Sequence, residues 1–221
     1  MRAYHFLSAK WALEDLEKKR LKIATFNDLN DPFELFSFDM SDPVDRWTLR
    51  MTKEQTEKET GVLCFSRNWG DPLLWSHYAD KHRGVCIGFD VQDDQVTRVT
   101  YTENRLVISA RDVDNASEEE GKSLMVRLLS TKYIGWQYEE EVRAYISLEE
   151  KNSSTGLYYV DFGEKLKLKE IIVGPLCSAG NKVKIKKVIG GFSEAVELIQ
   201  ARLAFGKFEV VKDQRGYRAD Q

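Results

Sequence analysis

The carboxylates best placed to do chemistry lie in the segment WQYEEEVRAY, residues 136–145. If this segment is a strand, Glu139, Glu141, Arg143 and Tyr145 share its more accessible face, because successive side chains alternate. A carboxylate held by arginine, with a second carboxylate beside it, suits a catalytic pair in which one acid reacts and the other orients the substrate. The alternative is a solvated strip with an internal ion pair, which contributes little to stability.

A second group of reactive side chains lies in the segment WSHYADKHRG, residues 75–84. On a helix, His77 and His82 are separated by about 500° of rotation, so they point to different sides, whereas a two-histidine metal face normally uses a spacing of four. A metal site is therefore not expected here. Trp75 and Tyr78 are three residues apart, which is typical of core packing and also suits a platform for a flat ligand.

The third group lies in the sequence LNDPFE, which is predicted to be a rigid turn. Proline forces the preceding Asp31 to be extended, and Asn30, Asp31 and Glu34 are available to bond the backbone of the turn. The acids of this turn could instead join Glu139 and Glu141 around Mg²⁺, which would make the protein a metal-dependent nuclease. The sequence contains no serine-hydrolase elbow, phosphate-binding glycine loop or dinucleotide fingerprint.

Length and composition predict a single domain over residues 1–221, with a basic helical segment from about residue 175. Of the 221 residues, 42% are hydrophobic and 31% are charged, which excludes a disordered chain. The net charge of −3 hides an asymmetry: residues 165–221 hold 12 basic and 6 acidic side chains, and residues 1–164 hold 21 and 30. If the basic segment folds back beside Glu141, it could attract a phosphate-bearing cofactor.

Cysteine usage and hydropathy predict a soluble cytoplasmic protein. Cys64, Cys86 and Cys177 are odd in number, widely spaced and within apolar runs, so we expect small buried side chains in a reducing compartment. The N-terminus lacks the apolar region of a signal peptide, and no stretch approaches the roughly 18 apolar residues that a membrane span needs.

Many short strands and a few helices without regular alternation predict an α+β fold, with mostly antiparallel central sheets and flanking helices. Helix starts are predicted after Ser8, Asp71 and Ser117, because these residue types cap orphan backbone donors, and the second helix is expected to end at Lys81. The remaining predictions are strands at 21–25, 61–65, 84–91, 96–101, 106–109, 139–148, 157–162, 168–173 and 208–211, a helix at 183–204 broken at 190–191, and a surface helix or mobile cover at 41–60.

Four motifs, in the same order over about residues 4 to 176, resemble a bacterial family of uncharacterised domains. The motifs are LNDPFE, the CFS that begins at Cys64, WSHYA followed by His82 and Gly84, and the W-x-Y-E-x-E-x-R that begins at Trp136. They are specific as a set and not singly. Some members of that family are grouped with abortive-infection proteins, so the resemblance implies a toxin or effector in phage defence, with a neutralising antitoxin as partner.

The chain is also similar in outline to the ADP-ribosyltransferase fold, in which a first strand supplies a histidine or arginine, a second region an aromatic residue or serine, and a later strand a glutamate. This similarity implies NAD as the cofactor and an unknown protein or nucleic acid as the acceptor. Laid on that scheme, His5 would contact the adenosine ribose, Tyr78 would stack on nicotinamide, and Glu141 would be the catalytic glutamate. The implied catalytic set is Glu141, Glu139 and Tyr78, and the implied cofactor-binding set is His5, Tyr4, His77 and Arg143.

The chemistry of such a site is coherent, because cleaving the nicotinamide bond passes through a cationic sugar that a carboxylate stabilises. The sequence departs from the scheme in two places: Tyr78 lies on a predicted helix, and the chain after Gly174 has no counterpart.

The sequence is also compatible with two other functions. The first is a non-catalytic nucleic-acid-binding or sensing module, and the second is the metal-dependent nuclease. The first would use the basic segment, although its lysines spread over several helix faces and lack interleaved aromatic residues. These lysines are Lys182, Lys184, Lys186 and Lys187.

Overall fold

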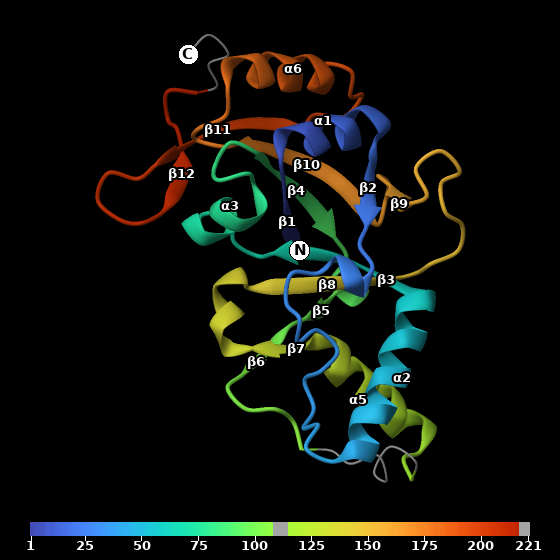
Figure 1. Cartoon of the computed structure of the whole chain (residues 1–221). Helices are drawn as coiled ribbons and strands as arrows, with labels where there is room; N and C mark the ends of the chain where they lie inside the picture. The colour runs from blue at the N-terminus through green and yellow to red at the C-terminus, as the bar shows by residue number, and fades with distance from the viewer. Residues whose placement is uncertain (108–114, 217–221) are drawn as a thin grey trace.

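The fold is built on one large, mostly antiparallel sheet (Figure 1). The computed structural model describes residues 1–107 and 115–216. Within these residues eight strands form the sheet in the order β12-β11-β10-β4-β1-β3-β8-β5. Their bounds are β12 Val210–Lys212, β11 Glu197–Leu203, β10 Leu166–Val173, β4 Val85–Val91, β1 Arg2–Leu7, β3 Thr60–Ser66, β8 Glu141–Ser147 and β5 Thr97–Arg98. The predicted α+β class is confirmed.

The sheet is split between β1 and β3. These two strands share a single register pair, Tyr4 with Ser66, whereas β1 pairs with β4 over its whole length and β3 pairs with β8 along seven residues. The split separates an upper half, β12-β11-β10-β4-β1, from a lower half, β3-β8-β5. The backbone groups freed at such an edge are available for side chains, water or a ligand.

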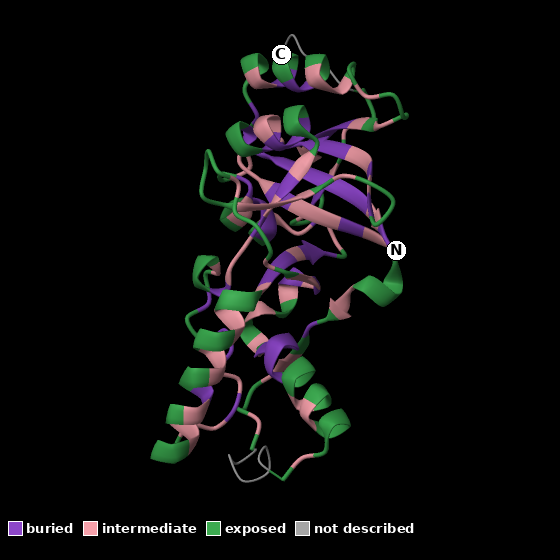
Figure 2. Ribbon diagram, turned by 90° about the vertical axis from the view of Figure 1, so that its right-hand side faces the viewer, coloured by how far each residue is buried: buried purple, intermediate pink, exposed green. Residues whose placement is uncertain are grey.

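Helices cover both faces of the upper half. On one face, α1 (Ala9–Lys18) and α6 (Ala179–Ile189) pack over the sheet through Leu16 and Ile185, both fully buried. On the other face lies α3 (Pro72–Tyr78), which is anchored by the fully buried Trp75. Figure 2 shows the strands of this half as the buried part of the molecule and the outer sides of the helices as exposed.

The lower half carries the remaining elements. Helices α2 (Pro43–Glu59) and α5 (Glu118–Ser130) extend below it (Figure 1), with Leu49, Leu128 and Leu129 in a separate small core. Two small sheets complete the frame, β2 (Arg20–Ile23) with β9 (Tyr158–Asp161), and β6 (Thr100–Thr102) with β7 (Thr131–Tyr133). The short 3-10 helices are η1 (Phe26–Asp28), η2 (Asp93–Gln95) and η3 (Ile134–Glu139).

The predicted capping box at Ser117 is confirmed, with both reciprocal bonds to Glu120 present. Other predicted elements begin or end at different residues. The helix after Asp71 ends at Tyr78 and not at Lys81, because residues 80–82 take left-handed φ angles of 46°, 52° and 68°. Residues 41–60 are mostly helix α2.

The helix predicted at 183–204 is wrong in its second half. Helix α6 ends at Ile189, before the two glycines, and residues 197–203 form β11, which pairs in parallel with β10. The apolar residues of 197–203 therefore pack as part of the sheet and not as one face of a helix. The strand predicted at 106–109 is reduced to a bridge from Leu106 to Phe38, and its last two residues lie outside the described ones.

No helix in residues 1–107 or 115–216 is long and apolar enough to cross a membrane.

Gly84, immediately before β4, is the glycine of the described residues with the least room for a side chain. A Cβ there would lie 2.1 Å from the Leu7 carbonyl oxygen and 2.8 Å from that of Ala79, so backbone would have to move. We expect Gly84→Ala to lower the free energy of unfolding by about 1–3 kcal/mol, measured by denaturant unfolding. Gly121→Ala in α5 is the matched control, because nothing lies within 4 Å of its Cβ position and alanine favours a helix. Equal effects of the two substitutions would contradict this prediction.

Asp15, on the buried side of α1, makes stability depend on pH. Burial raises its pKa from 3.8 to about 7, and the neighbouring Glu14 charge adds to the shift. The folded protein therefore holds this proton more tightly than the unfolded chain, so the contribution of Asp15 to stability is fully present below about pH 4 and is lost as pH rises through about 7. We expect Asp15→Asn to raise the melting temperature at pH 8 and to weaken its fall between pH 5 and pH 8. A fall as steep as in the wild type would contradict this assignment.

Candidate active site

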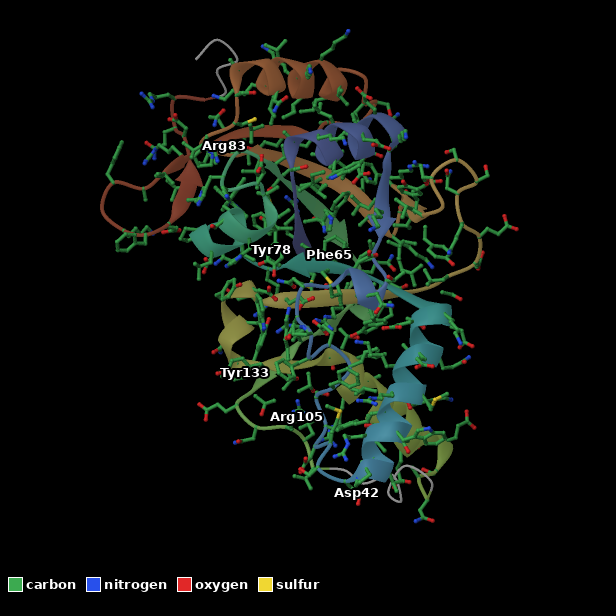
Figure 3. All side chains as sticks on the ribbon, in the orientation of Figure 1. Asp42, Phe65, Tyr78, Arg83, Arg105 and Tyr133 are labelled. Carbon is green, nitrogen blue, oxygen red and sulfur yellow. The ribbon has the colours of Figure 1, made fainter. Side chains whose placement is uncertain are left out.

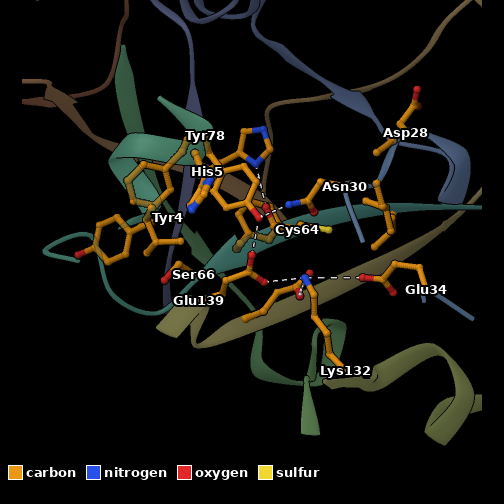
Figure 4. A pocket seen from close by; sticks show the side chains of 18 of the residues that line it. Tyr4, His5, Asp28, Asn30, Glu34, Cys64, Ser66, Tyr78, Lys132 and Glu139 are labelled. Carbon is orange, nitrogen blue, oxygen red and sulfur yellow. Dashed lines mark hydrogen bonds and ion pairs between the residues drawn. The ribbon is translucent and has the colours of Figure 1, made fainter. Parts of the chain in front are cut away.

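A cavity of about 490 Å³ opens where β1 and β3 separate (Figure 4). This volume is within the range of small-molecule sites, about 300–1,000 Å³. Six of the seven residues implied by the sequence resemblance line it, and the seventh, Arg143, lies behind the wall and bonds two lining carboxylates. The six are Tyr4, His5, His77, Tyr78, Glu139 and Glu141.

Strand β1 supplies one wall from the edge that the split leaves free. The His5 imidazole spans the split, with Nδ1 2.8 Å from the Cys64 carbonyl oxygen of β3, so Nδ1–H is the donor. Burial lowers the pKa of His5, which favours the neutral ring. Tyr4 lies at the one remaining register pair, opposite Ser66, and both side chains line the cavity.

Helix α3 places aromatic rings over the cavity. Asp71 caps the helix by accepting from the Leu73 amide, and the indole of buried Trp75 donates to the Trp69 carbonyl at 2.6 Å. The helix is therefore fixed at both its start and its buried side, which directs His77 and Tyr78 towards the cavity, with ring centroids 6.0 Å apart.

The Tyr78 hydroxyl joins two distant segments. It accepts a hydrogen bond of 2.8 Å from the Asn30 carboxamide and donates one to the Glu139 carboxylate (Figure 4). Asn30 belongs to the predicted turn, which thus reaches across the cavity. Burial and the Glu139 charge raise the pKa of Tyr78 well above its usual range, so this hydroxyl stays protonated.

The predicted strip at residues 139–145 is not on an accessible face. Strand β8 begins only at Glu141, and Glu139 lies in η3. Glu139, Glu141 and Arg143 are 4%, 6% and 1% exposed. The second face of the sheet is covered by the turn that carries Glu34 and by the end of α5, and alternation along a single strand does not predict that cover. A solvated strip is therefore excluded.

These side chains instead form a buried charge cluster, which we define as Glu34, Lys132, Glu139, Glu141 and Arg143. The ammonium of Lys132 lies 2.7 Å from Glu139, 3.3 Å from Glu141 and 3.6 Å from Glu34. The Arg143 guanidinium bonds both oxygens of Glu34 at 2.6 and 2.9 Å and both oxygens of Glu141 at 2.8 and 3.0 Å. With every group ionised, three carboxylates face two cations, which leaves one net negative charge at the cavity floor.

The pKa values of Glu139 and Glu141 are shifted in opposite directions. Burial would raise the pKa of Glu141, but the charges of Arg143 and Lys132 outweigh it and hold that pKa at about 2. Burial raises the pKa of Glu139 above its usual range despite the Lys132 charge, and the Glu141 charge adds to the rise. Glu141 is thus neutralised by its partners, whereas Glu139 carries the least compensated charge and is the better proton acceptor.

Sequence reasoning missed Lys132 and the role of Glu34. Lys132 lies on the short strand β7, and no motif marks it. One indirect signal was available, because three acids and one arginine on buried elements require a further cation. Glu34 was assigned to turn bonding or, as the alternative, to a metal site with Glu139 and Glu141; it does lie beside those two acids, but its carboxylate is held by Arg143.

The basic segment lies away from this cavity. Helix α6 lies at the top of the view in Figure 1, whereas β8 lies near its middle, and none of the described residues 175–216 lines the cavity. Lys182 is buried, and Lys184 and Lys187 line a groove beside α1 together with Glu17.

Comparison with known proteins gives one match. Residues 74–144 match a family model described as a protein of unknown function, DUF2971. The matched segment begins in α3 and contains Tyr78, Lys132, Glu139, Glu141 and Arg143, and it leaves out β1 and the turn that carries Glu34. No curated protein and no solved structure matches the chain.

Proposed function

We propose that the cavity binds NAD and that the protein cleaves the bond between nicotinamide and ribose, either transferring ADP-ribose to an acceptor or releasing it to water. The observation that carries the proposal is the convergence of His5, Tyr78 and Glu139 from three distant segments on one cavity with a charged floor. The role as a toxin or effector in phage defence is part of the same proposal and rests on the sequence resemblance alone.

The cavity suits a flat cation. Oxidised NAD carries a positive charge on its nicotinamide ring, and the charge cluster offers one net negative charge below the rings of Tyr78 and His77. Aromatic faces attract such a ring both by contact area and by their quadrupole. At the mouth, Lys22 lines the cavity and is half-exposed, so its ammonium is available to the diphosphate although it pairs with Asp28 at 3.2 Å.

The reaction needs one bond to break and one to form. The bond from ribose C1′ to the nicotinamide nitrogen breaks, both electrons leave with nicotinamide, and the ring becomes neutral while the sugar becomes cationic. The Glu139 carboxylate stabilises that cation, and the acceptor, a hydroxyl, an amine or water, then attacks C1′. The acceptor loses a proton in this step, which Glu139 takes up because its raised pKa suits a general base.

The other residues position Glu139. Tyr78 and Lys132 each bond one of its oxygens, which fixes the carboxylate, and Asn30 fixes Tyr78 in turn. Glu141, which the sequence resemblance places in the catalytic role, is occupied on both oxygens by Arg143 and serves to hold the cations in place.

The proposal is tested by incubating the purified protein with NAD, with and without cell extract, and measuring released nicotinamide. Release by wild type that is lost in Glu139→Gln supports the proposal. Equal release by both proteins, or none by either with extract present, would remove it.

Neither alternative function gains a specific observation. For a nuclease, the carboxylate oxygens of Glu34, Glu139 and Glu141 converge on Lys132 and Arg143 and do not leave a shared open position. Across the residues that the structure describes, no three acidic, histidine or cysteine side chains are arranged to hold a metal ion. For a nucleic-acid module, only Lys184 and Lys187 of the four α6 lysines line the groove beside α1, together with Lys19 and Glu17, and Lys182 is buried.

A further inference from the structure

A second cavity, of about 280 Å³, lies on the other side of the charge cluster. Its walls come from the turn after Pro32, from residues 102–105 that follow β6, and from β7. Glu34 and Lys132 line both cavities, so this ion pair forms a shared wall. Figure 3 shows Arg105 and Tyr133 of the second cavity together in the lower half of the molecule, below Tyr78 of the first.

Three aromatic rings line this second cavity: Phe33, Phe36 and Tyr133. Phe33 is 55% exposed and Tyr133 is 56% exposed, which is unusual for such large side chains on a small cavity. The guanidinium of Arg105 lies over the Phe33 ring, 5.3 Å from its centroid. The face of Phe33 therefore already accommodates a planar, nitrogen-rich group.

The inner wall favours an uncharged ligand. The Glu34 carboxylate is bonded on both oxygens by Arg143, and the Lys132 ammonium is shared among three carboxylates. These two charges are already compensated, and the other charged side chains of the lining, Asp31, Glu103 and Arg105, are of both signs, so the lining selects neither an anion nor a cation.

The rim supplies hydrogen-bonding groups that the protein does not use itself. Among the described residues, the Asn104 carboxamide has no hydrogen-bond partner. The Arg105 guanidinium lies over Phe33 and its charge acts on the Asp39 carboxylate, but it makes no hydrogen bond or close ion pair with another described residue. The Ser37 hydroxyl, which also lines the cavity, is buried without a partner. A carboxamide next to a guanidinium offers donors and an acceptor, which is the set that reads the edge of a nucleobase.

We propose that the second cavity binds an uncharged nucleobase-like group, stacked on Phe33 and Tyr133 and hydrogen-bonded by Asn104 and Arg105. Aromatic side chains take any base on their faces, and the polar rim selects among the edges. A polyanionic nucleic acid is disfavoured because residues 1–164, which contain this cavity, carry nine more acidic than basic side chains. The ligand class is thus a free nucleoside or base. This site does not depend on NAD binding in the first cavity.

The test is to titrate the full chain with adenosine, guanosine, cytidine and uridine in turn, and to measure binding by ligand-observed NMR or calorimetry. We expect saturable binding of at least one nucleoside, weakened about tenfold by Phe33→Ala and by Asn104→Ala. Phe208→Ala is the matched control, because this ring is fully exposed on the turn between β11 and β12, and binding should be unchanged.

Two results would overturn the proposal. One is the absence of saturable binding for all four nucleosides. The other is binding that Tyr78→Ala weakens and Phe33→Ala does not, since this would place the nucleoside in the first cavity. Both outcomes are independent of NAD cleavage, so the failure of one proposal leaves the other standing.

Discussion

Glu139→Gln is expected to slow the release of nicotinamide from NAD by about 100-fold or more. The substitution keeps the size of the side chain and one oxygen that can accept from Lys132, and the new amide N–H can donate to the Tyr78 hydroxyl, but it removes the least compensated negative charge of the cavity floor. Loss of a charge that stabilises a cationic transition state, together with loss of a general base, has effects of this order. Stability should change little, because a buried carboxylate with a raised pKa is costly to ionise.

Glu140→Gln is the matched control for this experiment. Its side chain is 42% exposed, pairs with Arg67 at 3.4 Å and does not line the cavity, so the rate should stay at the wild-type value. The rates come from nicotinamide release under identical conditions, with unfolding curves to show that all three proteins are folded. If Glu139→Gln and Glu140→Gln react equally fast, Glu139 has no catalytic role.

Arg143→Met is expected to lower the free energy of unfolding by about 3–5 kcal/mol. The guanidinium holds both oxygens of Glu34 and of Glu141 inside the protein, so its removal leaves two buried carboxylates with only Lys132 to share. The deficit should shrink as the pH falls, because the two orphaned carboxyls can then protonate.

The control for this prediction is Arg215→Met. Arg215 forms an ion pair of 3.2 Å with Asp213, but its side chain is 66% exposed and the pair is screened by water, so its loss should change the free energy of unfolding little. Denaturant unfolding at pH 7 and at pH 5 measures both variants. If Arg143→Met is no more destabilising than Arg215→Met, the charge cluster does not contribute to stability as described.

The local signals in the sequence predicted much of the fold. The capping box at Ser117, the Asp71-Pro72 helix start and the apolar runs at 61–65 and 84–91 are decided by neighbouring residues, and the structure has elements at all of them. The class α+β followed from their number and order. The stretch that became β11 was misassigned because its partner strand β10 lies more than twenty residues away, and pairing at that distance leaves no local pattern.

The sequence predicted most of the residues that form the candidate site, but not the residues that surround and bury them. Spacing showed that Glu141 and Arg143 share a strand face, but burial of that face depends on Glu34 and on Lys132, which arrive from other elements. Tyr78 and Glu139 are 61 residues apart, and only the packing of α3 beside η3 brings them into contact. The difference between the two glutamates likewise depends on which cation each one meets.

The most direct test of the central claim, that this cavity recognises the cationic nicotinamide ring of NAD, compares the binding of NAD and NADH by calorimetry. The two molecules differ in the charge of the ring, so the net negative floor predicts tighter binding of NAD, at least about tenfold, and loss of that preference in Glu139→Gln. Tyr78→Ala should weaken the binding of NAD. Absence of saturable NAD binding, or equal affinities for NAD and NADH that neither variant alters, would contradict the account.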